Sequence, residues 1–263
     1  MSEVFACIKN ENMKIYRRVG PRIMIGIIIA AVCILALIQN YSPTPPASMW
    51  NFAYDNIEVF VAFIIMFAVI IAAGSISGEF SKGTIKLLLI RPINRSKILL
   101  SKYVASLMFS FIMLVLSITL SLVVGGMFFG FEAPSQANVT TMDGSTVENV
   151  LPHFTSSIAF VSVDILMMVT IGFMISTIFH NSALAIGVTI FLRFAGPNIV
   201  LALQQYDWAK YILFANLNLR QHIGGVPYLE GLTMTFSVIT LIVYFFIFII
   251  LTWWIFNKKD VAT

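Results

Sequence analysis

Residues 57 to 77 read IEVFVAFIIMFAVIIAAGSIS, an apolar run in which the one charged side chain is Glu58. About 18 apolar residues suffice to cross the roughly 30 Å hydrocarbon layer of a bilayer. A run this long and continuous favours a helix, because outer-membrane strands alternate polar and apolar residues over about ten positions. The stretch therefore predicts a membrane-spanning helix.

Five further runs have the same character. The six expected spans are approximately Ile23 to Gln39, Ile57 to Ser77, Val104 to Gly130, Ile158 to Phe179, Ala183 to Leu203 and Leu232 to Phe256. The composition agrees, since 59% of the 263 residues are hydrophobic and 11% are charged, against about 25% charged in an average soluble domain. We predict an all-α membrane protein with six transmembrane helices in a single domain over residues 1–263.

The basic residues lie mainly before the first span, between the second and third spans, and after the last span. They are Lys9, Lys14, Arg17, Arg18, Arg22, Lys82, Lys86, Arg91, Arg95, Lys97, Lys102, Lys258 and Lys259. The connections at residues 40–56 and 132–157 contain no Lys or Arg. The positive-inside rule therefore predicts a cell-membrane protein with both termini in the cytoplasm. These cations are dispersed along the chain, whereas nucleic-acid-binding proteins gather them on one face. We therefore expect no nucleic-acid partner.

Residues 1–20 are expected to form an amphipathic helix at the membrane interface. Val4, Ile8 and Ile15 fall near one helical face, with the basic side chains largely elsewhere. Those side chains would contact anionic lipid headgroups, and Pro21 would end the helix and turn the chain into the bilayer. The alternative is an unstructured basic leader that only sets the topology.

Two long connections are expected on the external side. Residues 131–157 are predicted to be a loop, because Pro134, Gly144 and Pro152 limit regular structure. Residues 204–231 are predicted to be an external or re-entrant segment.

The chain before that second segment has two possible paths. Either the fifth span kinks at Gly196-Pro197 and ends near Leu203, or it breaks there and a re-entrant segment follows. Irregular backbone at membrane depth has to be shielded by protein or water.

Residues 78–97, between the second and third spans, are expected to have structure of their own. Leu88 and Leu89 belong to an apolar stripe, Pro92 stops that short helix, and Asn94 or Ser96 can cap the next helix. Glu79 would make either a polar tie at the membrane boundary or a local pair with Lys82.

This connection resembles that of the permease subunits of type-2 ATP-binding-cassette exporters, particularly compact permeases for peptides and antibiotics. The family pattern reads approximately Glu, a few residues, Gly-Thr, Leu-Leu, Pro, Arg and Lys. The matching positions are Glu79, Gly83, Thr84, Leu87, Leu88, Pro92, Arg95 and Lys102. The basic N-terminal helix, the six spans and the broken region before the last span agree with the same family layout.

The resemblance implies that the segment is a coupling helix, seated in a cleft of a cytoplasmic ATPase subunit. Glu79, Gly83, Thr84, Leu87, Leu88, Pro92 and Arg95 would be the coupling residues. It also implies two permease chains, identical or sibling, with two ATPase subunits, and a hydrophobic or amphipathic peptide or antibiotic as the exported substrate.

The chain itself contains no G-x-x-x-x-G-K-[ST] phosphate-binding loop. We therefore expect no enzyme activity and no cofactor in this chain, with ATP and Mg on the partner ATPase. Cys7 and Cys33 lack metal-ligand spacing, and no metal site is expected.

Asp164 and Arg193 lie inside predicted spans, where a charge is costly unless it is paired or wetted. Their expected depths are compatible with an ion pair, and the alternatives are a role in the translocation path or misplaced span boundaries. Two other function classes stay open. One is a non-transporting sensor or immunity subunit, and the other is an ion-coupled secondary transporter that uses these two residues.

Overall fold

The computed structural model describes residues 2–81, 94–134, 137–140, 146–179, 181–223, 227 and 229–258. Within them, six helices are long enough and apolar enough to span a membrane, which confirms the predicted fold class. They are α2 (Val19–Asn40), α4 (Ile57–Ser81), α6 (Arg95–Phe129), α7 (Val150–Ile178), α8 (Ser182–Ala202) and α10 (Met234–Lys258).

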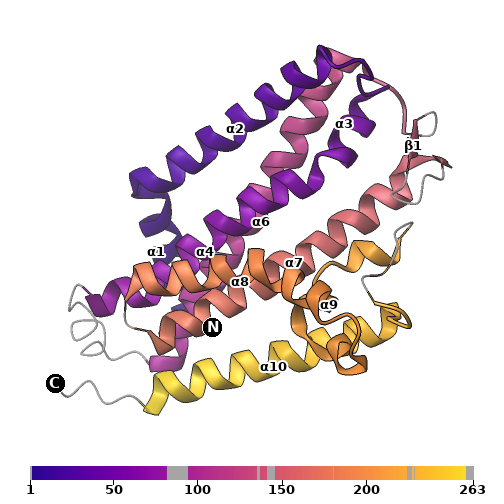
Figure 1. Ribbon diagram of the computed structural model, residues 1–263. Coiled ribbons are helices and arrows are strands. Elements are labelled where there is room, and N and C mark those ends of the chain that lie inside the picture. Colours follow the sequence, from indigo (N-terminus) through magenta and orange to yellow (C-terminus); the bar gives the residue numbers. More distant parts are fainter. Residues whose placement is uncertain are drawn as a thin grey trace.

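The other described elements are short or lie outside the spans. They are α1 (Ser2–Arg17), α3 (Met49–Asp55), the 3-10 helices η1 (Asp207–Tyr211) and η2 (Leu219–His222), α9 (Leu213–Asn216), and an antiparallel hairpin of β1 (Asn138–Thr140) and β2 (Thr146–Glu148). Figure 1 places α1 at one end of the bundle, and α3, β1 and α9 toward the other. We call these the α1 end and the α3 end.

Helices α4 and α7 form the centre of the bundle. In each, 61% of the apolar segment is buried, whereas in the peripheral α10 the share is 11%. Ala68, Ala72 and Ala73 on α4 are completely buried. Small side chains let neighbouring backbones approach closely in a membrane, where lipid tails are as apolar as leucine and packing drives helix association.

The peripheral helices bury one face. On α2, Ile28, Val32 and Ala36 recur every four residues and are buried, while Ile34 is 54% exposed. Side chains four residues apart share one side of a helix. The other side of α2 is therefore available to lipid.

Helix α6 is longer than its expected span at Val104 to Gly130. Its 35 residues make about 52 Å of helix at 1.5 Å per residue, more than the roughly 30 Å hydrocarbon layer. Asn94 caps its start, as the sequence indicated, because the Asn94 side-chain oxygen accepts a hydrogen bond from the Ser96 backbone N–H. The helix is therefore longer than the hydrocarbon layer is thick, and Lys97 and Lys102 near its start contact α1.

The N-terminal helix is present, but Pro21 does not end it. The break falls at Arg18, whose backbone is extended, and Pro21 is the third residue of α2. A proline is tolerated in the first turn because the backbone N–H groups there have no helical partner. The interfacial position of α1 stays a prediction.

The expected loop at 131–157 is also shorter than predicted. Its described part contains the β1–β2 hairpin, and α7 begins at Val150. Pro152 is the third residue of α7, again in a first turn, so it does not limit the helix.

The fifth span follows the first of its two possible paths. Helix α8 continues through Gly196 and Pro197 to Ala202. The chain then folds back through η1, α9 and η2, and Leu213, Asn216 and Leu219 of this segment are buried. Asn216 donates hydrogen bonds to the carbonyls of Lys210 and Ile212, so its amide shields irregular backbone.

Candidate functional site

The expected coupling residues fall partly outside the described residues. Gly83, Thr84, Leu87, Leu88 and Pro92 lie there. Of the others, Glu79 is in the last turn of α4 and Arg95 is the first residue of α6. The two helices that flank residues 82–93 are thus described up to the edges of the connection.

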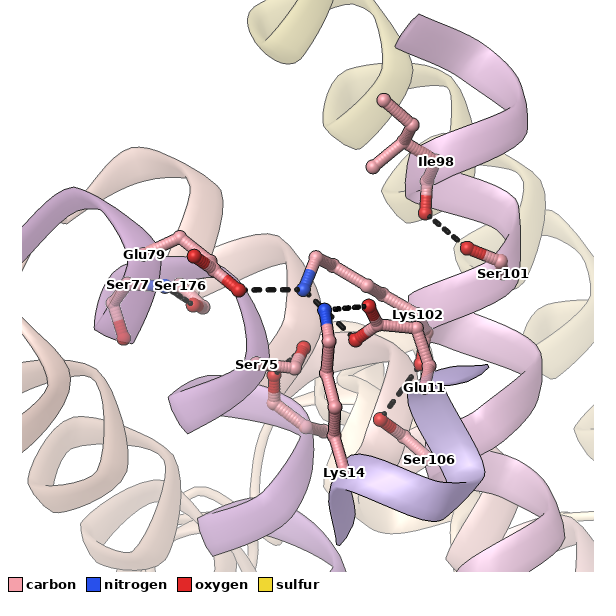
Figure 2. Close-up of polar contacts among 11 residues, drawn as sticks. Glu11, Lys14, Ser75, Ser77, Glu79, Ile98, Ser101, Lys102, Ser106 and Ser176 are labelled. Carbon is pink, nitrogen blue, oxygen red and sulfur yellow. Dashed lines mark hydrogen bonds and ion pairs between the residues drawn. The ribbon is translucent and has the colours of Figure 1, made fainter. Parts of the chain in front are cut away.

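A cluster of four charged residues joins these flanking helices to α1. We call Glu11, Lys14, Glu79 and Lys102 the Lys102 cluster. Lys102 Nζ lies 3.0 Å from Glu11 Oε2 and 3.3 Å from Glu79 Oε1, and Lys14 Nζ lies 2.6 Å from Glu11 Oε1. Figure 2 shows Lys102 between the two carboxylates. One lysine of α6 therefore ties α1 and α4 together.

Lys102 is 4% exposed, which makes its pairing necessary. A buried ammonium is costly unless carboxylates and hydrogen bonds compensate its lost hydration. Burial by itself would raise the pKa of Glu11, but the adjacent Lys102 and Lys14 ammonium groups outweigh it and hold that pKa below its ordinary value. The Glu11 carboxyl is therefore ionised at neutral pH.

A second contact between α1 and α6 is exposed to solvent. Lys97 Nζ lies 2.8 Å from Glu3 Oε2, with both side chains largely accessible. Hydrogen bonding to Lys97 lowers the pKa of Glu3. Screening by water makes such a pair weak, so we expect the less exposed Lys102 cluster to contribute more than this pair to the attachment of α1.

A serine contact lies two residues before Glu79 in α4. The Ser77 backbone N–H donates to Ser176 Oγ at 3.0 Å, and Ser176 Oγ donates to the Ala73 carbonyl. In a regular helix the Ser77 N–H would bond that same carbonyl. The α7 hydroxyl thus contacts both the N–H and the carbonyl of one turn of α4, and side chains that contact a helix backbone in this way are a known cause of local bending. Ser77 Oγ also lies 3.0 Å from Ser182 Oγ at the start of α8.

The structure brings Asp164 and Arg193 together. Arg193 Nη2 of α8 lies 3.1 Å from Asp164 Oδ2 of α7, and the Asp164 side chain is 8% exposed. Asp164 Oδ1 and Arg193 Nε are buried and make no hydrogen bond within the described residues. The pair neutralises two charges inside the spans but leaves part of its hydrogen-bonding capacity unused. Its role in the translocation path stays a prediction.

A further charged contact lies at the α3 end. Arg220 of η2 is buried, its Nη1 lies 2.9 Å from Glu58 Oε1, and its guanidinium stacks 5.0 Å from the ring centre of Tyr54. Desolvation raises the pKa of the neighbouring Asp55, although the Arg220 charge partly opposes it. This contact fastens the folded-back segment onto α3 and α4.

Comparison with known proteins relates the chain to one family. A family model described as "Protein of unknown function (DUF2705)" matches residues 23–262, most of the chain. The chain belongs to the DUF2705 family.

Two Bacillus subtilis (strain 168) proteins are similar to this DUF2705 protein. "Uncharacterized protein YhcI" is 42% identical over 219 residues, which cover 82% of this chain and 70% of the relative. "Uncharacterized membrane protein YdbK" is 34% identical over 196 residues, or 73% of this chain and 76% of the relative. Together with the six apolar helices, these findings make the DUF2705 chain a multi-pass membrane protein.

Sequence reasoning had not identified Glu11 or the binding of two carboxylates by Lys102. The available signal was Glu11 itself, which with Glu3 is one of two acidic residues in an N-terminal helix that also carries three basic residues. Among the described residues of this DUF2705 protein, no group of three or more His, Cys, Asp and Glu side chains is placed to hold a metal ion.

Proposed function

We propose that this DUF2705 protein is the permease subunit of a type-2 ATP-binding-cassette exporter, energised by ATP hydrolysis on a separate cytoplasmic subunit. The supporting observation is the Lys102 cluster. Glu79 precedes residues 82–93 and Lys102 follows them, and their ion pair holds the two flanking helices together. Glu11 adds α1 to the same unit.

This arrangement suits the transmission of force. If a partner ATPase displaces residues 82–93, the displacement reaches α4 and α6 together. The Glu79–Lys102 ion pair keeps the end of α4 from separating freely from the start of α6. Two residues before Glu79 in α4, Ser77 contacts Ser176 of α7 and Ser182 of α8. Motion entering through α4 would therefore bend it at this contact and shift the central α4–α7 pair.

The full proposal includes partners and substrate. Two permease chains, identical or sibling, would enclose the path, with ATP and Mg bound by the two ATPase subunits. The exported substrate would be a hydrophobic or amphipathic peptide or antibiotic, which suits the apolar helices. Both termini and residues 78–97 would face the cytoplasm.

The test is a pull-down of the full chain from its native membrane in mild detergent, with mass spectrometry of the bound proteins and an ATPase assay. We expect a P-loop ATPase to co-purify with the wild type. Replacement of residues 83–89 should abolish that binding, and Glu79→Ala should uncouple ATP hydrolysis from the permease. Glu230→Ala, an exposed acid at the α3 end, is the matched control and should behave as wild type. A folded wild-type chain that recovers no ATPase would contradict the proposal.

An ion-coupled secondary transporter is the second candidate, favoured by the Asp164–Arg193 pair. Buried charges in spans mark ion and proton paths in many transporters. In that case, transport would stop when the ion gradient is collapsed at constant ATP, and loss of any partner ATPase would leave it unchanged.

A further inference from the structure

A groove of about 660 Å³ runs between α1 and α6. Its apolar lining is Phe5, Ile8, Met13 and Tyr16 from α1, and Met108 and Ile112 from α6. Phe5 is 71% exposed and Ile112 is 47% exposed, so neither helix covers the other here. The groove is distinct from the Lys102 cluster, which closes another part of the same junction.

Asn12 and two cations complete the lining of the groove. Lys9 and Arg17 are exposed, and neither forms an ion pair with a described residue. Eight residues of helix separate them by about 12 Å along α1. By contrast, Lys14, Lys97 and Lys102 of the same junction each have a glutamate partner. The positive charge at the groove is therefore left uncompensated.

The groove spans two environments. Met108 and Ile112 lie in the apolar part of α6 that is expected to cross the hydrocarbon layer, whereas Lys9 and Arg17 belong to a helix that precedes the first span. An occupant that satisfies both must be apolar at one end and anionic at the other. The bilayer itself supplies such a molecule.

We propose that this groove binds one anionic phospholipid. An acyl chain would cover Met108 and Ile112, and the headgroup phosphate would pair with Lys9 or Arg17. Juxtamembrane cations attract anionic lipids, and the apolar stems of Lys and Arg let their charged ends reach the headgroup region. The bound lipid would hold α1 against α6 beside Glu11. This inference does not depend on the transport function.

Native mass spectrometry of the full chain tests the site, after exchange into micelles containing phosphatidylglycerol or phosphatidylcholine. We expect one retained phosphatidylglycerol on the wild type. Lys9→Gln and Arg17→Gln should each weaken its retention about fivefold, because a cation near the headgroups contributes on that order to lipid attraction. Arg18→Gln removes the same charge just outside the groove and should leave retention unchanged.

A second variant separates the groove from general electrostatics. Ile112→Trp fills the apolar part without altering charge, and it should also lose the retained lipid while circular dichroism shows unchanged helix content. Equal retention of the two lipids by the wild type would overturn the proposal. So would equal losses in Arg18→Gln and Arg17→Gln, or a second copy of the chain on α1 in place of lipid.

Discussion

Lys102 shows how one residue can connect three helices. Its ammonium contacts Glu11 of α1 and Glu79 of α4, while its own backbone belongs to α6. It is nearly inaccessible, so its charge depends on these carboxylates for compensation. Loss of the cation removes the ammonium that Glu11 and Glu79 share, although Lys14 still contacts Glu11.

Lys102→Met should therefore destabilise the protein by about 3 kcal/mol or more, the usual result of removing one partner from a buried ion pair. Chemical unfolding in detergent, followed by circular dichroism, measures the change. Lys97→Met is the matched control on the same helix. Its Glu3 pair is exposed, so we expect only a small change. Equal effects of the two variants would contradict the structural role of Lys102.

Glu11 makes the attachment of α1 depend on pH. Its pKa is lowered below 4.5 in the folded protein, so its ion pairs stabilise the fold fully above the ordinary pKa of 4.5. That contribution is lost as the pH falls through the lowered folded value. The stability difference between wild type and Glu11→Gln should be largest near about pH 7 and should shrink as the pH falls below 4.5 through the lowered folded pKa of Glu11. Unfolding curves across this range check it, and a pH-independent difference would refute it.

At the scale of elements, the prolines had different consequences from those expected. Pro21 and Pro152 were expected to limit helices, yet each lies in a first turn. Pro197 lies inside α8, which continues past it. A proline lacks a backbone N–H, which matters only where a helical hydrogen bond would use that N–H. In the first turn none would, so the effect of a proline depends on where its helix begins. The sequence left these helix starts uncertain.

Gly196 sets the contact between α8 and α9. A Cβ at this position would collide with the ring of Phe214. Gly196→Ala should therefore force Phe214 and α9 away from α8 and cost about 1–3 kcal/mol, as overpacking usually does. Thermal unfolding in detergent is the measurement.

Gly187→Ala is the control for that substitution. Gly187 lies on the same helix, and an added Cβ would have no neighbour within 4 Å. Alanine favours helix by about 0.5–1 kcal/mol over glycine, so this variant should be neutral or slightly more stable. A loss of stability as large as that of Gly196→Ala would exclude the steric explanation.

At the scale of the molecule, charged contacts fasten the two ends in different ways. The α1 end is held by the Lys102 cluster, and the α3 end by the Arg220 contact with Glu58 and Tyr54. Between them, α4 and α7 provide the buried centre. In both contacts the central cation, Lys102 or Arg220, is buried, so a motion that opens either end has to separate an ion pair with a buried cation.

The apolar runs alone determined the number and type of spans. Hydrophobicity over about 20 residues is a local property of the sequence. In a bilayer such a segment forms a helix, because a helix satisfies its backbone hydrogen bonds within the segment itself. The cap at Asn94 was equally local. The contacts of Lys102 were not, because Glu79 and Glu11 lie 23 and 91 residues from it in the chain. Several cations were available to each acid, and ion pairing requires approach within about 4 Å. The packing of α1, α4 and α6 selects the partners, and sequence spacing specifies no such distance.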